Sequence, residues 1–240
     1  MRVRHRRMIT STETFGRGSL YRLLAWLSPS FPTGAFSYSH GLEAAAVAGT
    51  VHDRATLQSW IAAIIRHGSG RIDADILRDA YRAAQAHDFA ALDAANRRGI
   101  AFRGTAELAL ESSQQGAAFL STCLAAWRDP FLAEWAATTG ARVCLSAMFG
   151  AAAAGGGIAL DNALLAYLHA FAANLMSAGL RLGLIGQTDG QRILAALEPI
   201  VAEAAQAALN RASADFGSAT FAVDLASMAH ETQYSRLFRS

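Results

Sequence analysis

Two long runs without a charged residue constrain the fold of this chain most strongly. Residues 143–160 and 162–180 contain 18 and 19 uncharged residues, which is close to the length of a membrane-spanning helix. The first run is rich in alanine, a weak driver of membrane insertion, and its glycines, Gly150 and the triplet 155–157, favour an early helix end. The second run contains polar residues, among them Asn162. We therefore expect two helices buried in a protein core and no membrane span.

Helical periodicity is clear elsewhere in the chain. Apolar residues in the segment 57–65 follow the spacing of one helical face, and Asp53 precedes them as the expected N-cap. Thr188 begins a capping-box pattern, and the helix that follows should be kinked or divided at Pro199. No alternating polar and apolar stretch is long enough for a strand. With 52% hydrophobic residues, residues 19–240 are predicted to form an all-α, single-domain bundle of about ten helices.

The charge distribution separates the first 18 residues from the rest. They contain five arginines and one glutamate, whereas the whole chain has a net charge of only +2. They lack the apolar stretch and the cleavage site of a targeting peptide, so we expect residues 1–18 to be a disordered, Arg-rich N-terminus. The remaining chain is slightly acidic, which argues against nucleic-acid binding. Two cysteines without a CxxC motif suit a reducing, cytoplasmic location.

The sequence offers little that could carry catalysis. It has no phosphate-binding loop, dinucleotide fingerprint, HExxH or GxSxG motif. Its seven histidines do not pair at helical ligand spacing, so we predict no metal and no cofactor. His169 is interpreted as a hydrogen-bonded core residue, and Cys144 as a small buried apolar residue.

Residues 27–43, with the sequence LSPSFPTGAFSYSHGLE, interrupt this helical pattern. Prolines at two positions bias the chain away from helix, so a defined bend is expected here. The side chains of Ser37, His40 and Glu43 are too close in sequence to face one another as a catalytic triad. We interpret the segment as a helix entrance, with Ser37 or Thr33 as the cap, that presents polar groups to another protein.

The last 17 residues, DLASMAHETQYSRLFRS, combine arginine with aromatic residues, a composition that is typical of binding surfaces. Two interpretations remain open for residues 224–240. Either a last helix packs Leu237 and Phe238 on the core of the chain itself, or the segment becomes ordered on a partner.

Three blocks of the chain resemble the UreF family of urease accessory proteins. They are residues 27–43, residues 181–197 with the sequence GQTDGQR at 186–192, and residues 224–240. In the same order, they span roughly residues 20 to 240. The resemblance implies an all-helical homodimer without a catalytic site of its own.

The resemblance also implies partners. UreF-like proteins bind a second accessory protein, UreD or UreH, and then recruit the GTPase UreG to deliver nickel to apo-urease. The end of the C-terminal block, residues 234–240, would order against the UreD/UreH-type protein. Polar surface residues near the first block and near residues 181–187 would form or flank the GTPase platform. The candidate partner-binding residues are Ser37, Tyr38, Ser39, His40, Glu43, Arg181, Gln187, His230, Glu231, Gln233, Tyr234, Arg236, Leu237, Phe238 and Arg239.

Two alternatives to a purely partner-binding role remain open. Arg181 or Arg236 could act directly on the GTPase as an arginine finger. A helical enzyme with a small-molecule pocket, in which His169 would be needed, is a second alternative, although no substrate is indicated.

Overall fold

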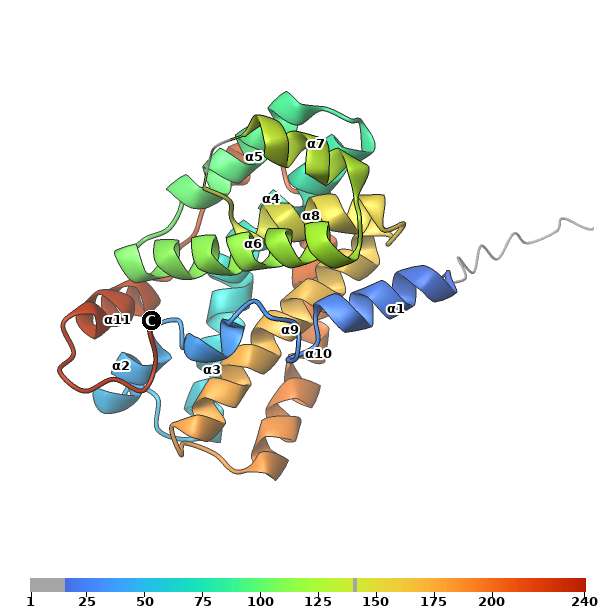
Figure 1. The fold of residues 1–240 in the computed structure, drawn as a ribbon. Helices are drawn as coiled ribbons and strands as arrows, with labels where there is room; N and C mark the ends of the chain where they lie inside the picture. Colours follow the sequence, from blue (N-terminus) through green and yellow to red (C-terminus); the bar gives the residue numbers. More distant parts are fainter. Residues whose placement is uncertain (1–15, 140–141) are drawn as a thin grey trace, which may run out of the picture.

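Every regular element in the described part of the chain, residues 16–139 and 142–240, is a helix in the computed structural model (Figure 1). The order is α1 (Arg17–Trp26), η1 (Ala35–Ser37), α2 (Leu42–Val47), α3 (Arg54–His67), α4 (Ser69–Gln85), α5 (Phe89–Ala101), α6 (Ala106–Ala126), α7 (Pro130–Thr138), α8 (Leu145–Gly155), α9 (Leu160–Arg181), α10 (Gln187–Asn210), η2 (Ser213–Asp215) and α11 (Phe221–Glu231). The prediction of an all-α fold with about ten helices is confirmed. Because α1 begins at Arg17, it includes the end of the expected N-terminal segment; residues 1–15 lie outside the described residues.

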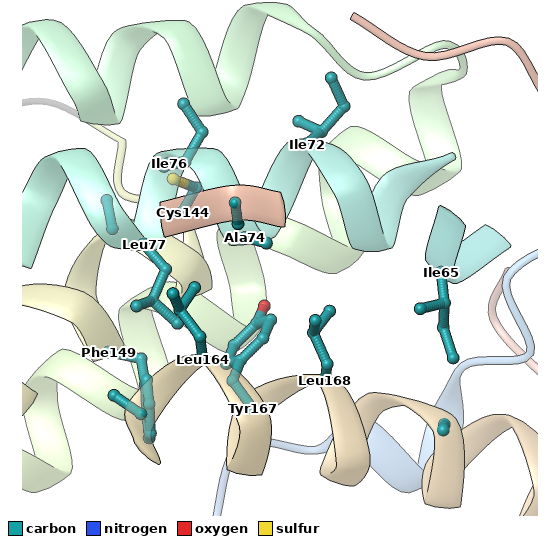
Figure 2. Close-up of a cluster of buried hydrophobic side chains, with 14 of the residues drawn as sticks. Ile65, Ile72, Ala74, Ile76, Leu77, Cys144, Phe149, Leu164, Tyr167 and Leu168 are labelled. Atoms are coloured by element: carbon teal, nitrogen blue, oxygen red, sulfur yellow. The ribbon is translucent and has the colours of Figure 1, made fainter. Parts of the chain in front are cut away.

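Helix α4 lies at the centre of the bundle, and α8 is its most extensive neighbour. One apolar face of α4 is buried, as Ile72, Ile76 and Ala80 show. Figure 2 shows Leu77 of α4 pointing toward Phe149 of α8 and the side chains of α9. Both side chains are almost completely buried. The core is therefore formed where α4, α8 and α9 meet.

Helix α8 approaches α4 closely at Gly150. A methyl group built on Gly150 would overlap the main-chain carbonyl oxygen of Leu77. Since a backbone carbonyl inside a helix cannot move away as a side-chain tip can, the two helices can keep this distance only with glycine at position 150.

The charged residues of α4 are paired inside the protein. Asp73 accepts a hydrogen bond from Arg103, in the turn after α5, at 2.5 Å, and Asp75 accepts one from Arg211, directly after α10, at 2.8 Å. Arg78 donates to the carbonyl oxygen of Arg211 at 3.0 Å. A buried charge without a partner is costly, so these pairs fix the turn before α6 and the end of α10 relative to α4.

The two uncharged runs form core helices, as expected. The first gives α8, which is only 11 residues long and buried along most of its length. The second lies in α9. By length and composition α9 and α10 could each cross a membrane, but 50% of the apolar window of α9 and 33% of that of α10 are buried inside the protein.

Some local predictions agree with the structure and others do not. Asp53 caps α3 in a capping box with Thr56, as expected. Thr188 does not cap α10, because the helix already begins at Gln187, and α10 continues through Pro199 without dividing. The interpretation of His169 as a core residue is wrong: its side chain is exposed on α9, because an uncharged run does not reveal which face of the helix is buried.

We predict that Gly150→Val lowers the free energy of unfolding by about 3 kcal/mol, because the new side chain collides with the backbone of α4. Urea denaturation followed by circular dichroism measures this change. The matched control is Gly18→Val in α1, where an added methyl meets nothing within 4 Å and the stability should change by less than about 0.5 kcal/mol. Equal stabilities of the two variants would contradict the close packing of α4 and α8.

Candidate functional site

The chain turns sharply before it enters α2. Gly34, His40 and Gly41 all have positive φ angles, of 75°, 57° and 77°. A methyl group on Gly41 would lie 3.0 Å from the main-chain nitrogen of Ser227, so α2 starts in direct contact with α11. The expected bend thus brings the segment 27–43 against the C-terminal helix.

The N-cap position of α2 is Gly41, which has no side chain to cap the helix, so neither expected residue holds it. Neither Ser37 nor Thr33 acts as the cap; the hydroxyl of Ser39 accepts the main-chain N–H of Glu43 at 3.3 Å. The expected caps lie too early in the chain, because residues 35–37 form the separate helix η1. Glu43 itself lies in the first turn, as expected, where a negative charge is favourable.

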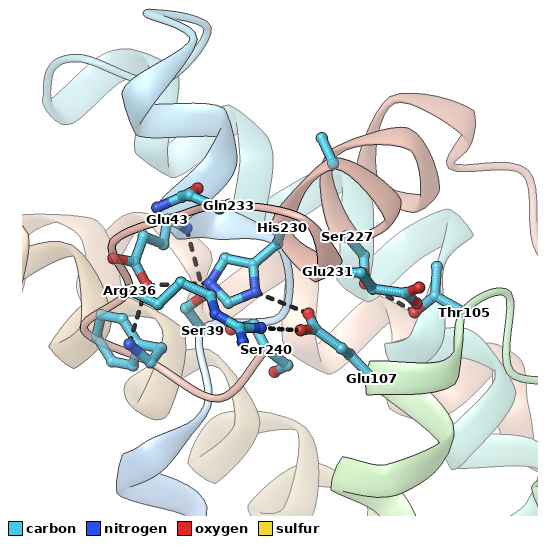
Figure 3. A network of polar contacts seen from close by, with 12 residues as sticks. Ser39, Glu43, Thr105, Glu107, Ser227, His230, Glu231, Gln233, Arg236 and Ser240 are labelled. Atoms are coloured by element: carbon cyan, nitrogen blue, oxygen red, sulfur yellow. Dashed lines mark hydrogen bonds and ion pairs between the residues drawn. The ribbon is translucent and has the colours of Figure 1, made fainter.

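The carboxylate of Glu43 holds the C-terminal tail. It accepts the main-chain N–H groups of Leu237 and Phe238 at 2.7 and 2.9 Å, and it lies 3.1 Å from Nε2 of His230. Figure 3 shows the tail curving around this side chain. Burial by itself would raise the pKa of Glu43, but the hydrogen bonds from Leu237, His230 and Phe238 outweigh it and hold the pKa below 4.5.

His230 bridges two acids. Its Nδ1 atom lies 2.7 Å from the carboxylate of Glu107 on α6, and its other nitrogen faces Glu43. A carboxylate only accepts hydrogen bonds, so both ring nitrogens must carry a proton for both contacts to be hydrogen bonds. Arg236 donates to the second oxygen of Glu107 at 2.9 Å. These contacts join α2, α6, α11 and the tail (Figure 3).

A second group of contacts fixes the end of the tail. The main-chain N–H of Ser39 donates to the main-chain oxygen of Ser240 at 2.8 Å. The hydroxyl of Ser240 donates to Glu111 at 3.0 Å, and Glu111 also faces Nδ1 of His40 at 3.2 Å. The N–H of Arg239 donates to the carbonyl oxygen of Ser37 at 2.8 Å. The tail therefore runs alongside the bend that precedes α2.

Arg181 connects the same two segments from α9. Its guanidinium lies 3.7 Å above the ring of Phe36 and 4.3 Å from the ring of Phe238, and it donates to the carbonyl oxygen of Phe36 at 2.5 Å. Partial burial lowers the pKa of Arg181 from its ordinary value. The side chain is stacked between two rings of its own chain, so it neither extends freely into solvent nor points away from the tail.

The candidate residues thus divide into buried and exposed sets. Tyr38, Ser39, His40, Glu43, His230 and Phe238 are buried. The expectation that the bend displays its polar side chains is therefore wrong for the first four of them. The tail encloses Ser39 and Glu43, whereas the side chains of Tyr38 and His40 face residues of α6. Ser37, Arg181 and Gln233 are partly buried, and Gln187, Glu231, Tyr234, Arg236, Leu237 and Arg239 are exposed.

Sequence reasoning missed an apolar stripe on α11. Phe221, Leu225 and Met228 are 79%, 64% and 48% exposed, while Val223 and Ser227 on the other side of the helix are buried. The i, i+4, i+7 spacing could have revealed the stripe. With the exposed side chains of Tyr234 and Leu237, it forms what we call the C-terminal apolar surface.

The described residues contain no cluster of three or more histidine, cysteine or acidic side chains that could hold a metal ion. Both cysteines are buried, and burial, with a smaller contribution from Asp129, raises the pKa of Cys123 to about 12. Neither Cys123 nor Cys144 is therefore a reactive thiolate at neutral pH.

We predict that Glu43→Gln lowers the free energy of unfolding by about 2 kcal/mol at pH 7. The folded pKa of Glu43 lies below its ordinary value of 4.5. The carboxylate therefore stabilises the fold above that pH, and the contribution is lost as pH falls through the folded pKa. Urea denaturation between pH 7 and pH 3 should show the gap to wild type closing in acid. Glu198→Gln, on the exposed side of α10, is the control, and a gap that stays constant down to pH 3 would contradict the assignment.

Comparison with known proteins identifies the family of this chain. A family model described as UreF matches residues 51–198. The urease accessory protein UreF of Granulibacter bethesdensis is 48% identical over 229 residues, covering 95% of this chain and 97% of the relative. UreF of Methylorubrum populi is 48% identical over 91% of this chain and 98% of its own length, and UreF of Rhodopseudomonas palustris strain TIE-1 is 46% identical over 92% of each. The family comprises accessory proteins and not enzymes, which confirms the expectation that this chain has no catalytic site of its own. The chain belongs to the UreF family of urease accessory proteins, which act in urease maturation.

Proposed function

We propose that this protein is a scaffold of urease maturation in the cytoplasm. It binds the UreD/UreH-type accessory protein, and the complex recruits the GTPase UreG to deliver nickel to apo-urease. This chain makes and breaks no bond itself. One observation supports the proposal: internal contacts fix the C-terminal segment of this UreF family member while the side chains of Tyr234 and Leu237 face outward.

The C-terminal apolar surface suits a protein partner. Isolated exposed apolar residues are common, but here Phe221, Leu225 and Met228 follow one face of α11, and Tyr234 and Leu237 are exposed in the tail that follows it in sequence. Tyrosine in particular supplies much contact area with little loss of side-chain freedom on binding. We assign this surface to the UreD/UreH-type protein.

The GTPase platform is proposed near the bend and the start of α10. Phe36 is 66% exposed over Arg181, and Gln187 is exposed at the start of α10. The buried residues of the bend would act there only by holding the surface in shape. A homodimer would present two such platforms side by side, so that two GTPase molecules could be aligned.

We predict that Tyr234→Ala and Leu237→Ala each weaken binding of the UreD/UreH-type protein at least tenfold, because apolar contact area at the centre of an interface is lost. Both side chains are exposed in the free chain, so the helical signal should not change. Gel filtration of the purified components, with the GTPase added, measures retention of each protein. Leu165→Ala, an exposed leucine on α9, is the matched control. Wild-type retention by both tail variants would exclude this surface.

A second prediction separates scaffolding from direct action on the GTPase. Arg181→Lys should weaken GTPase retention, because lysine keeps the charge but cannot stack its head group flat between Phe36 and Phe238. GTP hydrolysis per bound GTPase should remain as in wild type, measured by phosphate release. The opposite result, an intact complex with lost stimulation of hydrolysis, would support an arginine finger instead.

A further inference from the structure

The last nine residues of the chain form no helix or strand. Such a segment cannot satisfy its main-chain N–H groups within itself, so its shape depends on acceptors elsewhere in the protein. For two consecutive residues, Leu237 and Phe238, the acceptor is the carboxylate of Glu43, 194 and 195 residues earlier in the sequence.

Fixing these two amides also decides which side chain faces outward. The side chain of Phe238 is 4% exposed and packs in the core, whereas Leu237 beside it is 62% exposed. A tail that loses this anchor could rotate or detach, and Tyr234 and Leu237 would then lose their fixed positions.

We propose that Glu43 is the positioning residue of the C-terminal apolar surface: its carboxylate holds the tail in the one shape that presents Tyr234 and Leu237 together. Glu43 is buried and touches the tail rather than the solvent, so it acts on a partner only through the tail. The inference rests on the proposed binding of the UreD/UreH-type protein to this surface.

The neighbours of Glu43 explain why a carboxylate is needed. Three donors converge on it: two main-chain N–H groups and the imidazole of His230. Glutamine has the same shape, but its amide nitrogen is a donor and would face a donor in this site. Aspartate keeps the charge, but its side chain is one methylene shorter and cannot reach all three donors equally well.

The test compares Glu43→Gln and Glu43→Asp with wild type in the full-length protein. Carboxypeptidase digestion measures how fast the tail residues are released, gel filtration measures retention of the purified UreD/UreH-type protein, and circular dichroism measures helix content. Glu198→Gln on α10 is the control. We expect Glu43→Gln to accelerate tail release and to weaken partner binding at least tenfold with unchanged helix content, and Glu43→Asp to give intermediate values.

The outcomes separate the two proposals. A tail that stays protected in Glu43→Gln overturns the role of Glu43, whatever the partner does. A released tail with wild-type partner binding supports the role of Glu43 and overturns the assignment of the surface to the UreD/UreH-type protein.

A measurement on the wild-type protein needs no variant. The amides of Leu237 and Phe238 should exchange hydrogen about tenfold more slowly than that of Ser235, because they are held by a buried acceptor. Equal exchange rates at the three positions would overturn the proposal even if Glu43→Gln did not fold.

Discussion

The close contact between α4 and α8 is the interaction on which the rest of the fold depends. Gly150 allows the backbone of α8 to lie directly against the carbonyl of Leu77, and the alanines around it keep both helices near each other along their length. With α4 fixed in the centre, its acids can fix other elements in turn. Asp73 holds the turn that leads into α6, through Arg103. The position of α6 decides where Glu107 and Glu111 lie, and therefore where the tail can be bound.

The candidate site is built differently from this core. Its parts, α2, α6, α11 and the tail, are joined by carboxylates and histidines, and the ring of Phe238 is the apolar contact of the tail with the core. Apolar packing tolerates small shifts, whereas a buried carboxylate such as Glu43 loses most of its value when a donor moves away. This construction suits a segment that must adopt one shape while only the ring of Phe238 enters the core.

The sequence predicts a structural feature well when the residues that determine it lie close together in the chain. The cap at Asp53 and the apolar face of α3 follow from neighbouring residues, and they were predicted correctly. The burial of His169 was predicted wrongly, because an apolar run indicates a helix but not which face of that helix is buried. The bend and the tail were seen as two separate surfaces, since no periodicity connects Glu43 with residues 237 and 238. Glu107 and Glu111 did leave a signal, two acids one helical turn apart between buried positions of α6, and it was missed.

The same contacts bear on how a partner would be recognised. A tail that orders only on binding loses conformational freedom at that moment, and this cost weakens affinity. In this chain the main-chain groups of Leu237 and Phe238 already have their acceptor in Glu43, and the ring of Phe238 is already in the core. A partner would then have to immobilise only the exposed side chains, chiefly Tyr234 and Leu237. Affinity at this surface would therefore depend as much on the buried acids that shape the tail as on the residues that touch the partner.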